Sequence, residues 1–194
     1  WMSDGFTLDS NVKGGLMKGL GRMFSGESLF MATYTASRPD SVIAFASTVP
    51  GKILAIDTAK TSLICQKGAF LCAQPTVEIN TVLTKKFTAG FFGGEGFILQ
   101  QIQGSGMAFL EVDGDVVERV LAPGEVIKVD TGNVFAFEPS ISYEIETVKG
   151  VKNILFGGEG LFLTKLTGPG KVYMQTMNIA EFTGRIAQGL PASK

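Results

Sequence analysis

A glutamate flanked by small residues occurs three times in this chain, at Glu27, Glu95 and Glu159. The later two copies read F-G-G-E-G, and the first reads F-S-G-E-S. Three carboxylates around a pseudo-threefold axis could hold a cation, although hard-cation sites normally add further oxygen ligands at defined spacings. Alternatively, each glutamate accepts backbone N–H bonds or pairs with a nearby lysine, while the glycines permit close approach. We favour this structural interpretation, because duplication copies a structural device automatically.

A second repeated feature precedes each glutamate, in residues 12–24, 82–92 and 148–156. Each segment mixes two or three basic residues with bulky apolar ones. If the copies surround an axis, all three segments emerge at one end, which would suit an anionic membrane surface or an acidic partner groove. The alternative, which we favour, is that they plug the open end of a β-structure. The candidate interaction residues are Lys18, Arg22, Phe24, Lys85, Lys86, Phe91, Phe92, Lys149, Lys152 and Phe156.

The composition argues against catalysis. The 194 residues include no histidine, which removes the commonest general base, the commonest metal ligand and the usual partner of a serine or cysteine nucleophile. No paired arrangement of Glu, Asp or Lys replaces it, and no G-x-x-x-x-G-K-[ST] phosphate loop is present. We therefore expect no enzyme, no catalytic residue, no cofactor and no bound metal.

The charge balance bears on partners and location. Seventeen basic and eighteen acidic residues leave a net charge of −1, so no global field would attract nucleic acid. No stretch resembles a signal peptide, and no apolar run reaches the ~18 residues of a membrane span. We expect a soluble, cytoplasmic chain. Its two cysteines, Cys65 and Cys72, lie in what reads as one hairpin, and we favour buried free thiols over a disulfide.

An internal duplication must position these features. Shifting the sequence by 64 residues superimposes the second copy on the third, and identities at one offset are hard to explain by composition. A degenerate first copy matches at an offset of 68 around Glu27, because a longer turn at 37–41 replaces a short glycine turn. The identical positions include Gly68 with Gly132, Pro75 with Pro139, Lys85 with Lys149, Phe92 with Phe156, Glu95 with Glu159, Leu99 with Leu163, Gly104 with Gly168 and Gly106 with Gly170.

The repeat predicts the domain organisation. We expect repeats at 1–58, 59–122 and 123–186, with a tail at 187–194, packed as one globular unit. The first copy lacks its opening hairpin, so we expect residues before Trp1 to be missing. A missing hairpin would leave an open sheet edge that another subunit or copy could cover. We therefore expect a homo-oligomer.

Each copy reads as β-strands. Residues 77–81 and 141–147 alternate apolar and polar side chains, the period of a half-buried strand. Residues 124–138 predict a hairpin around Asp130–Asn133, and the Gly-Pro-Gly turn at 168–170 predicts a second one. We expect an all-β fold: an antiparallel β-sandwich or prism built from three internal repeats of about 64 residues, with short connecting helices.

The tripled motif, with the segments QKGAFLCAQPTVEI, DTGNVFAFEPSISYEI and VYMQTMNIAEFTGRI, resembles the altered-inheritance-of-mitochondria family of mitochondrial biogenesis factors. It looks closest to that family's uncharacterised bacterial relatives. The resemblance implies a fold like the tryptophan RNA-binding attenuation protein (TRAP-like), and it supplies no catalytic residues. Family members usually carry an extra N-terminal strand region. Fungal relatives organise protein complexes at the mitochondrial inner membrane. Since this chain has no Arg-rich presequence, we expect a bacterial cytoplasmic protein, peripheral to the membrane at most.

These observations give a ranked set of functions. The first is a non-enzymatic scaffold or interaction protein that docks to a membrane surface or a protein partner through the basic-apolar segments. The alternative is a small-ligand or cation-binding module that uses Glu27, Glu95 and Glu159. RNA binding comes third, because it rests on fold analogy alone and no basic-aromatic track accompanies it.

Overall fold

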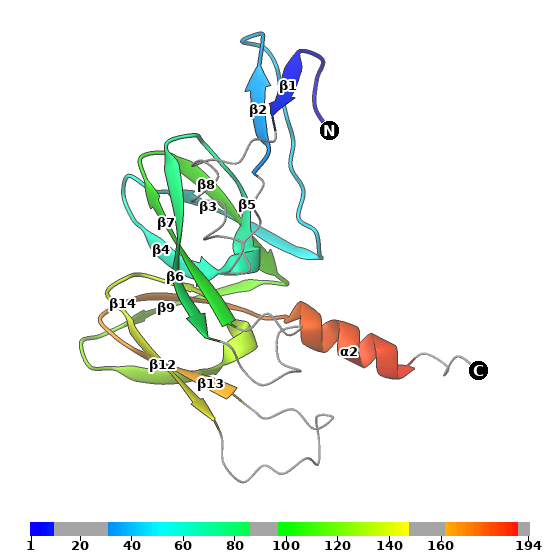
Figure 1. Cartoon of the computed structure of the whole chain (residues 1–194). Helices are drawn as coiled ribbons and strands as arrows, with labels where there is room; N and C mark the ends of the chain where they lie inside the picture. The colour runs from blue at the N-terminus through cyan, green and yellow to red at the C-terminus, as the bar shows by residue number, and fades with distance from the viewer. Residues whose placement is uncertain (10–30, 86–96, 148–161, 190–194) are drawn as a thin grey trace. The chain divides into compact units, whose positions relative to one another are not determined.

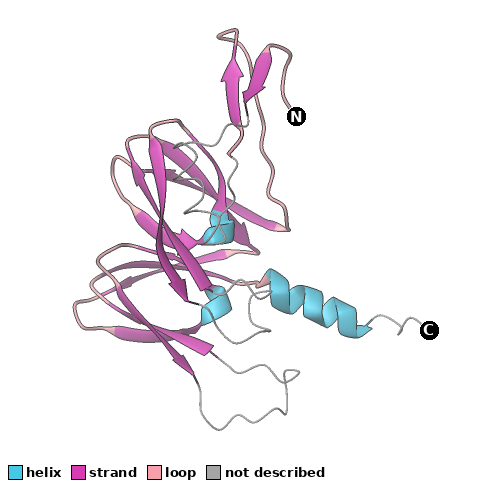
Figure 2. Ribbon diagram, viewed as in Figure 1, coloured by secondary structure: helices cyan, strands magenta, loops and turns pink. Residues whose placement is uncertain are grey.

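The computed structural model describes residues 1–9, 31–85, 97–147 and 162–189. Their contacts divide the chain into two compact units, Trp1–Ala46 and Ser47–Lys194. The described part of the second unit consists mainly of strands, that of the first contains one pair of strands, and the described α-helix follows the last strand (Figures 1 and 2). The all-β class predicted from the sequence is confirmed. The three repeats, their boundaries and the prism-like, TRAP-like arrangement stay predictions.

The first unit contains a two-stranded antiparallel sheet. Strand β1 (Phe6–Asp9) pairs with β2 (Thr33–Ala36), and the rings of Tyr34 and Phe45 meet edge to face with their centroids 5.5 Å apart. None of the described side chains in this unit is fully buried. A sheet of two strands is marginally stable without further packing, so the described part of this unit contributes little stability of its own.

The described residues of the second unit form three antiparallel sheets, with the strand orders β6-β7-β4-β11-β14-β9, β3-β8-β5 and β10-β13-β12. Its strands are β3 (Gly51–Asp57), β4 (Leu63–Gln66), β5 (Phe70–Ala73), β6 (Val77–Lys85), β7 (Phe97–Gly104), β8 (Met107–Asp113), β9 (Val116–Leu121), β10 (Val126–Asp130), β11 (Val134–Phe137), β12 (Ser142–Thr147), β13 (Phe162–Thr167) and β14 (Gly170–Gln175). The 3₁₀ helices η1 (Lys67–Ala69) and η3 (Thr131–Asn133) precede β5 and β11, and the α-helix α2 (Ile179–Gly189) follows β14.

Two apolar clusters hold these sheets together. Strand β8 shows the cause, since Ala108, Leu110 and Val112 alternate with more exposed neighbours and are fully buried. The first cluster joins β3-β8-β5 to the six-stranded sheet, and the second joins β10-β13-β12 to it. The first cluster comprises Ile56, Leu63, Cys65, Ala69, Ile102, Ala108, Leu110, Val112, Phe135, Ala136 and Tyr173. The second comprises Leu99, Leu121, Val134, Phe137, Ile141, Leu166 and Val172.

The strand pairings recur at the 64-residue spacing of the sequence match. Helix η1 and strand β5 correspond, residue for residue, to η3 and β11. Adding 64 to both partners converts the β5–β8 register into the β11–β14 register. Both pairings also contain an irregularity at the same place, between Phe70 and Cys72 in one and between Val134 and Ala136 in the other.

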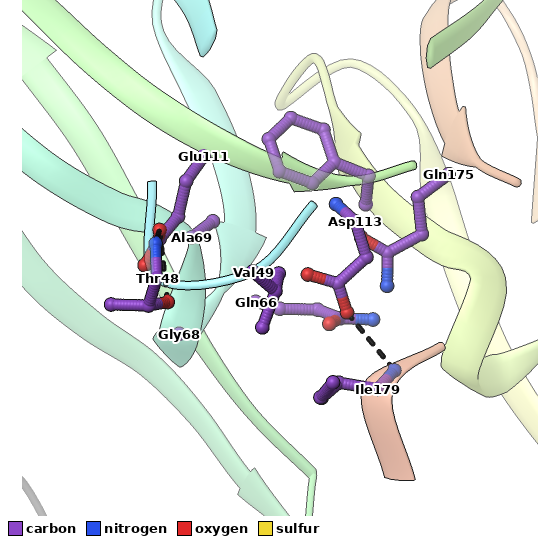
Figure 3. Close-up of a pocket in the computed structure, with 10 residues that line it drawn as sticks. Thr48, Val49, Gln66, Gly68, Ala69, Glu111, Asp113, Gln175 and Ile179 are labelled. Carbon is purple, nitrogen blue, oxygen red and sulfur yellow. Dashed lines mark hydrogen bonds between the residues drawn. The ribbon is translucent and has the colours of Figure 1, made fainter. Parts of the chain in front are cut away.

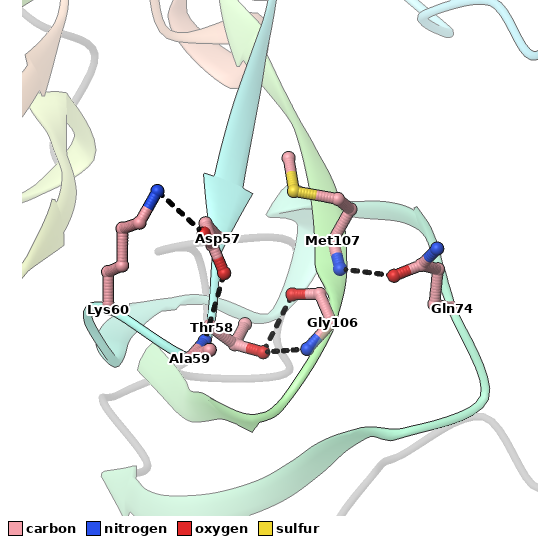
Figure 4. Close-up of polar contacts among 7 residues, drawn as sticks. All are labelled: Asp57, Thr58, Ala59, Lys60, Gln74, Gly106 and Met107. Carbon is pink, nitrogen blue, oxygen red and sulfur yellow. Dashed lines mark hydrogen bonds and ion pairs between the residues drawn. The ribbon is translucent and has the colours of Figure 1, made fainter.

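A turn hydrogen bond recurs in the same way. The side-chain oxygen of Gln74 accepts a hydrogen bond from the backbone N–H of Met107 at 2.8 Å (Figure 4). Sixty-four residues later, Glu138 Oε2 accepts from the N–H of Lys171, also at 2.8 Å. In the earlier segment the buried Thr58 hydroxyl adds a donated bond to Gly106 O at 2.8 Å and an accepted bond from Gly106 N at 3.0 Å. The start of β8 is thus bound to the loop before β6, and the start of β14 is bound in the same way to the loop before β12.

Both predicted hairpins are wrong. Strands β10 and β11 flank η3 but lie in different sheets, because β10 pairs with β13 while β11 pairs with β14 and β4. Strands β13 and β14 also lie in different sheets across the Gly168–Gly170 turn. Gly170 has φ of +144°, and a Cβ there would lie 2.6 Å from Ser140 Oγ. Glycine therefore allows a sharp corner at which the chain changes sheet.

The two cysteines likewise lie in different sheets and not in the predicted single hairpin. Cys65 lies on β4 and Cys72 on β5. Both are free thiols, and only Cys65 is fully buried, whereas Cys72 is half-buried. Burial raises the pKa of the Cys65 thiol to about 12, so this group stays protonated near neutral pH.

Candidate functional site

The repeated motif lies outside the described residues, and so do the basic-apolar segments except residues 82–85, which form the end of β6. Lys85 closes β6, but its side chain lies outside them as well. The predicted roles therefore stay predictions, and the described candidates are an exposed helix and a pocket at its start. The predicted site residues concerned are Glu27, Glu95, Glu159, Lys18, Arg22, Phe24, Lys86, Phe91, Phe92, Lys149, Lys152 and Phe156.

Helix α2 begins where its sequence supplies a cap. Asn178 accepts a hydrogen bond from the N–H of Ala180 through its side-chain oxygen, at 2.9 Å. This satisfies a backbone donor that the first helical turn leaves without a partner. Glu181 lies in the first turn, where negative charge is favourable, and forms an ion pair with Arg185 one turn later.

One face of α2 is apolar and exposed. Ile179, Phe182 and Ile186 have the spacing of a single helix face, and 37%, 43% and 48% of their respective surfaces are exposed. None of the eleven residues of α2 is buried. Figure 1 shows the helix extending away from the strands that precede it. An amphipathic helix with an uncovered apolar face is typical of an element that binds something else.

A pocket of about 240 Å³ lies at the start of α2 (Figure 3). It is lined by Thr48, Val49, Gln66, Gly68, Ala69, Glu111, Asp113, Phe135, Gln175 and Ile179.

Two carboxylates of β8 contribute to the pocket. Glu111 and Asp113 are two residues apart on a strand, so their side chains leave the same face. Glu111 Oε2 accepts hydrogen bonds from Thr48 N at 2.7 Å and from Thr48 Oγ1 at 3.1 Å. Asp113 Oδ2 accepts from the backbone N of Ile179 at 3.1 Å. Burial raises the pKa of the Asp113 carboxyl, the Ile179 hydrogen bond opposes this, and the charge of Glu111 adds to it.

Two glutamines complete the polar lining. Gln175 is nearly fully buried; it donates to Gly132 O at 2.8 Å and accepts from the N–H of Asp113 at 3.3 Å. Gln66 donates to the carbonyl of Val134. The carboxylates and amides could receive hydrogen bonds from a small ammonium or hydroxyl compound, but much of their capacity is used inside the protein. We interpret the pocket chiefly as the anchorage that fixes the start of α2.

Within residues 1–9, 31–85, 97–147 and 162–189, no three His, Cys, Asp or Glu side chains gather as metal ligands would.

Sequence reasoning missed α2 and its anchorage. The helix had a local signal: Asn178 as a cap, followed by apolar residues three and four positions apart. The anchorage had none. Asp113 and Ile179 are 66 positions apart, and only the fold brings them together.

No helix among the described residues has the length and apolar character to cross a membrane.

Comparisons with known proteins extend these observations. The family model described as mitochondrial biogenesis AIM24 matches residues 1–177, which ends just before α2. An uncharacterized protein of Streptococcus pyogenes serotype M6 is 28% identical over 181 residues, covering 93% of this chain and 72% of that protein. A crystal structure of another Streptococcus pyogenes protein is similar with a TM-score of 0.75 and 24% identity, covering 98% of this chain and 85% of that one. This last likeness shows the fold alone.

Proposed function

This chain belongs to the mitochondrial biogenesis AIM24 family, and on that premise we propose that it is a non-enzymatic interaction protein that binds a protein partner through the apolar face of α2. Family membership implies a role related to mitochondrial biogenesis through an unknown mechanism. The observation that carries the proposal is the exposed stripe of Ile179, Phe182 and Ile186 on a helix anchored to a β-core.

Charge favours a protein groove over a membrane as the binding surface. Attraction to anionic lipid needs several Lys or Arg residues beside the apolar face. On α2 the cation Arg185 is paired with Glu181, so the described helix carries no excess positive charge. An amphipathic helix of this kind fits an apolar groove, with side chains at i, i+3 and i+7 as anchors. The basic-apolar segments predicted from the sequence would add to this surface if they lie beside it.

The alternative of a cation or small-ligand module remains tied to Glu27, Glu95 and Glu159. These residues lie outside the described part of the chain. The two carboxylates of the pocket, Glu111 and Asp113, already accept hydrogen bonds from Thr48 and Ile179. The anchored, exposed helix therefore supports the interaction function better.

A site-specific cross-linker tests the proposal. A photoactivatable phenylalanine analogue is incorporated at position 182 of the full chain, in cells that naturally produce the protein. A control chain carries the same analogue at position 188. Gln188 lies outside the apolar face, about 120° around the helix from Phe182 by the 100° helical spacing. We expect a discrete protein adduct from position 182 and none from position 188. Equal adducts from both positions, or adducts to lipid alone, would contradict a protein partner.

The identified partner is then purified and its affinity measured. Phe182→Ser should weaken binding at least tenfold, because a buried aromatic anchor contributes about 2 kcal/mol. Thr183→Ser is the control, since it keeps the hydroxyl that donates to the Ile179 carbonyl at 2.8 Å and leaves the apolar face unchanged. The same affinity for Phe182→Ser and wild type would remove α2 from the interface.

A further inference from the structure

The second unit has six edge strands among its described sheets: β6 and β9, β3 and β5, and β10 and β12. The 64-residue correspondence divides them into two groups. Strand β6 corresponds to β12, and β3 corresponds to β9. In these two pairs both members are edge strands. Strand β5 corresponds to β11, and β10 to β4. In these two pairs one strand is an edge and its counterpart is not. Strands β4 and β11 pair with each other at the centre of the six-stranded sheet, whereas β5 and β10 are the edges of their sheets.

We propose that β10 of one molecule pairs with β5 of a second copy of this chain, in the antiparallel register that β4 and β11 show within one chain. That register places Cys65 opposite Ala136, and Ile64 opposite Phe137. Carried over by 64 residues, it places Val129 of one molecule opposite Cys72 of the other. Lys128 then lies opposite Ala73.

Burial supports this pairing. All four residues of β11 are buried, whereas all four residues of β5 are partly exposed. Cys65 is fully buried on β4, while the corresponding Val129 on β10 is partly exposed. Strands β5 and β10 therefore keep exposed the surface that their counterparts cover by pairing. An open edge presents unpaired backbone N–H and C=O groups, which template a further strand.

A second copy of the chain is the occupant that fits both edges. One molecule carries a β10 edge and a β5 edge, and these are the counterparts of two strands that already pair. An edge lysine normally discourages such pairing. Here Lys128 Nζ is held by Glu146 Oε2 at 2.6 Å, so its charge is compensated within its own molecule. The contact is head to tail, and it gives a ring or an open chain of molecules according to the rotation between them.

A disulfide across the proposed register tests it. Val129→Cys creates a thiol opposite Cys72 of the neighbouring molecule. The corresponding position in β4 is naturally Cys65, so cysteine suits this place in the sheet. Cys65 itself does not compete, because burial raises its pKa to about 12. The control is Val120→Cys on β9, which is an edge in both segments and where Val120 is 70% exposed.

Under mild oxidation, Val129→Cys should form a linked dimer at least tenfold faster than Val120→Cys. Mass spectrometry should locate the bond between Cys72 and position 129 of different chains, and adding Cys72→Ser should abolish it. Light scattering of the unmodified full chain should give a multiple of 20.6 kDa.

Three results would overturn the proposal. The first is a mass of 20.6 kDa at the concentration used for cross-linking. The second is equal linkage rates for the two variants when both unfold as cooperatively as wild type. The third is a bond between Cys72 and position 129 formed inside one chain, which would mean that the chain itself covers these edges.

Discussion

Gly68 and Gly132 occupy matching positions in η1 and η3 but have different surroundings. A Cβ built on Gly132 would lie 1.8 Å from Asn178 Nδ2, while one built on Gly68 would meet nothing within 4 Å. The sequence repeat explains why both are glycine. The structure shows that one of them has acquired a further constraint, because α2 begins against it.

The pair gives a matched prediction. Gly132→Ala should lower the free energy of unfolding by about 1–2 kcal/mol, because Asn178 must move and the cap of α2 is lost. Gly68→Ala should change it by less than about 0.5 kcal/mol. Urea denaturation followed by circular dichroism measures both. Equal effects at the two positions would show that Asn178 does not restrict Gly132.

At the residue scale, the sequence identified repeated residues but not those that the fold brings together. Glu27, Glu95 and Glu159 attract attention because their glycine-flanked motif is copied. Asp113 lies in no such motif, and its importance comes from Ile179, which is distant in the sequence. Local patterns report duplication and periodicity, whereas a pocket depends on partners that only folding supplies.

At the element scale, α2 depends on an anchor in the β-core. Asp113 Oδ2 accepts a hydrogen bond from the first N–H of the helix, yet burial raises the pKa of this carboxyl above its usual range. An acid whose pKa is raised on folding binds more protons in the folded state between the two pKa values. Its contribution to stability is therefore present at low pH and is lost as pH rises through the folded pKa.

The free energy of unfolding of Asp113→Asn should consequently increase relative to that of wild type as pH rises from about 4 to about 7. Asparagine keeps an oxygen for the Ile179 N–H and removes the charge that burial and Glu111 disfavour. Denaturation at several pH values measures the difference. Asp113→Ala is the control, and it should be about 1 kcal/mol less stable than Asp113→Asn because the acceptor is lost. Parallel pH profiles for Asp113→Asn and wild type would contradict the argument.

The strands also show what element-level prediction achieves. Apolar alternation located the strands at 77–81 and 141–147, which lie within or overlap β6 and β12. Apolar alternation did not predict which strands pair with one another. The turns at 131–133 and 168–170 connect different sheets and not hairpin arms. A short turn looks the same in sequence whether the chain folds back beside itself or crosses to the opposite sheet.

At the scale of the whole molecule, the two units differ in how they are stabilised. Every fully buried residue among those the structure describes belongs to Ser47–Lys194. The described part of Trp1–Ala46 contributes a two-stranded sheet with exposed apolar side chains, including Trp1 and Leu8. Among the described residues, the buried core therefore belongs to the second unit.

A chain of residues 47–194 should accordingly unfold in one cooperative transition, because both apolar clusters remain complete. Residues 1–46 alone should show no such transition. Urea denaturation of both fragments, with hydrogen exchange at β4, β7 and β11, checks this. Loss of cooperativity in the 47–194 fragment would mean that the first unit is required for the core.

By itself, the sequence determined the all-β class, the 64-residue spacing of matching elements and a resemblance to a family whose model spans residues 1–177. These properties follow from side-chain periodicity and motif identity, which are local in the chain. Only the tertiary structure decided that η3 joins different sheets, that β4 meets β11 while β5 and β10 stay edges, and that Asp113 anchors α2. Such contacts join segments many residues apart, and their choice depends on which apolar faces can be buried together once the whole chain has collapsed.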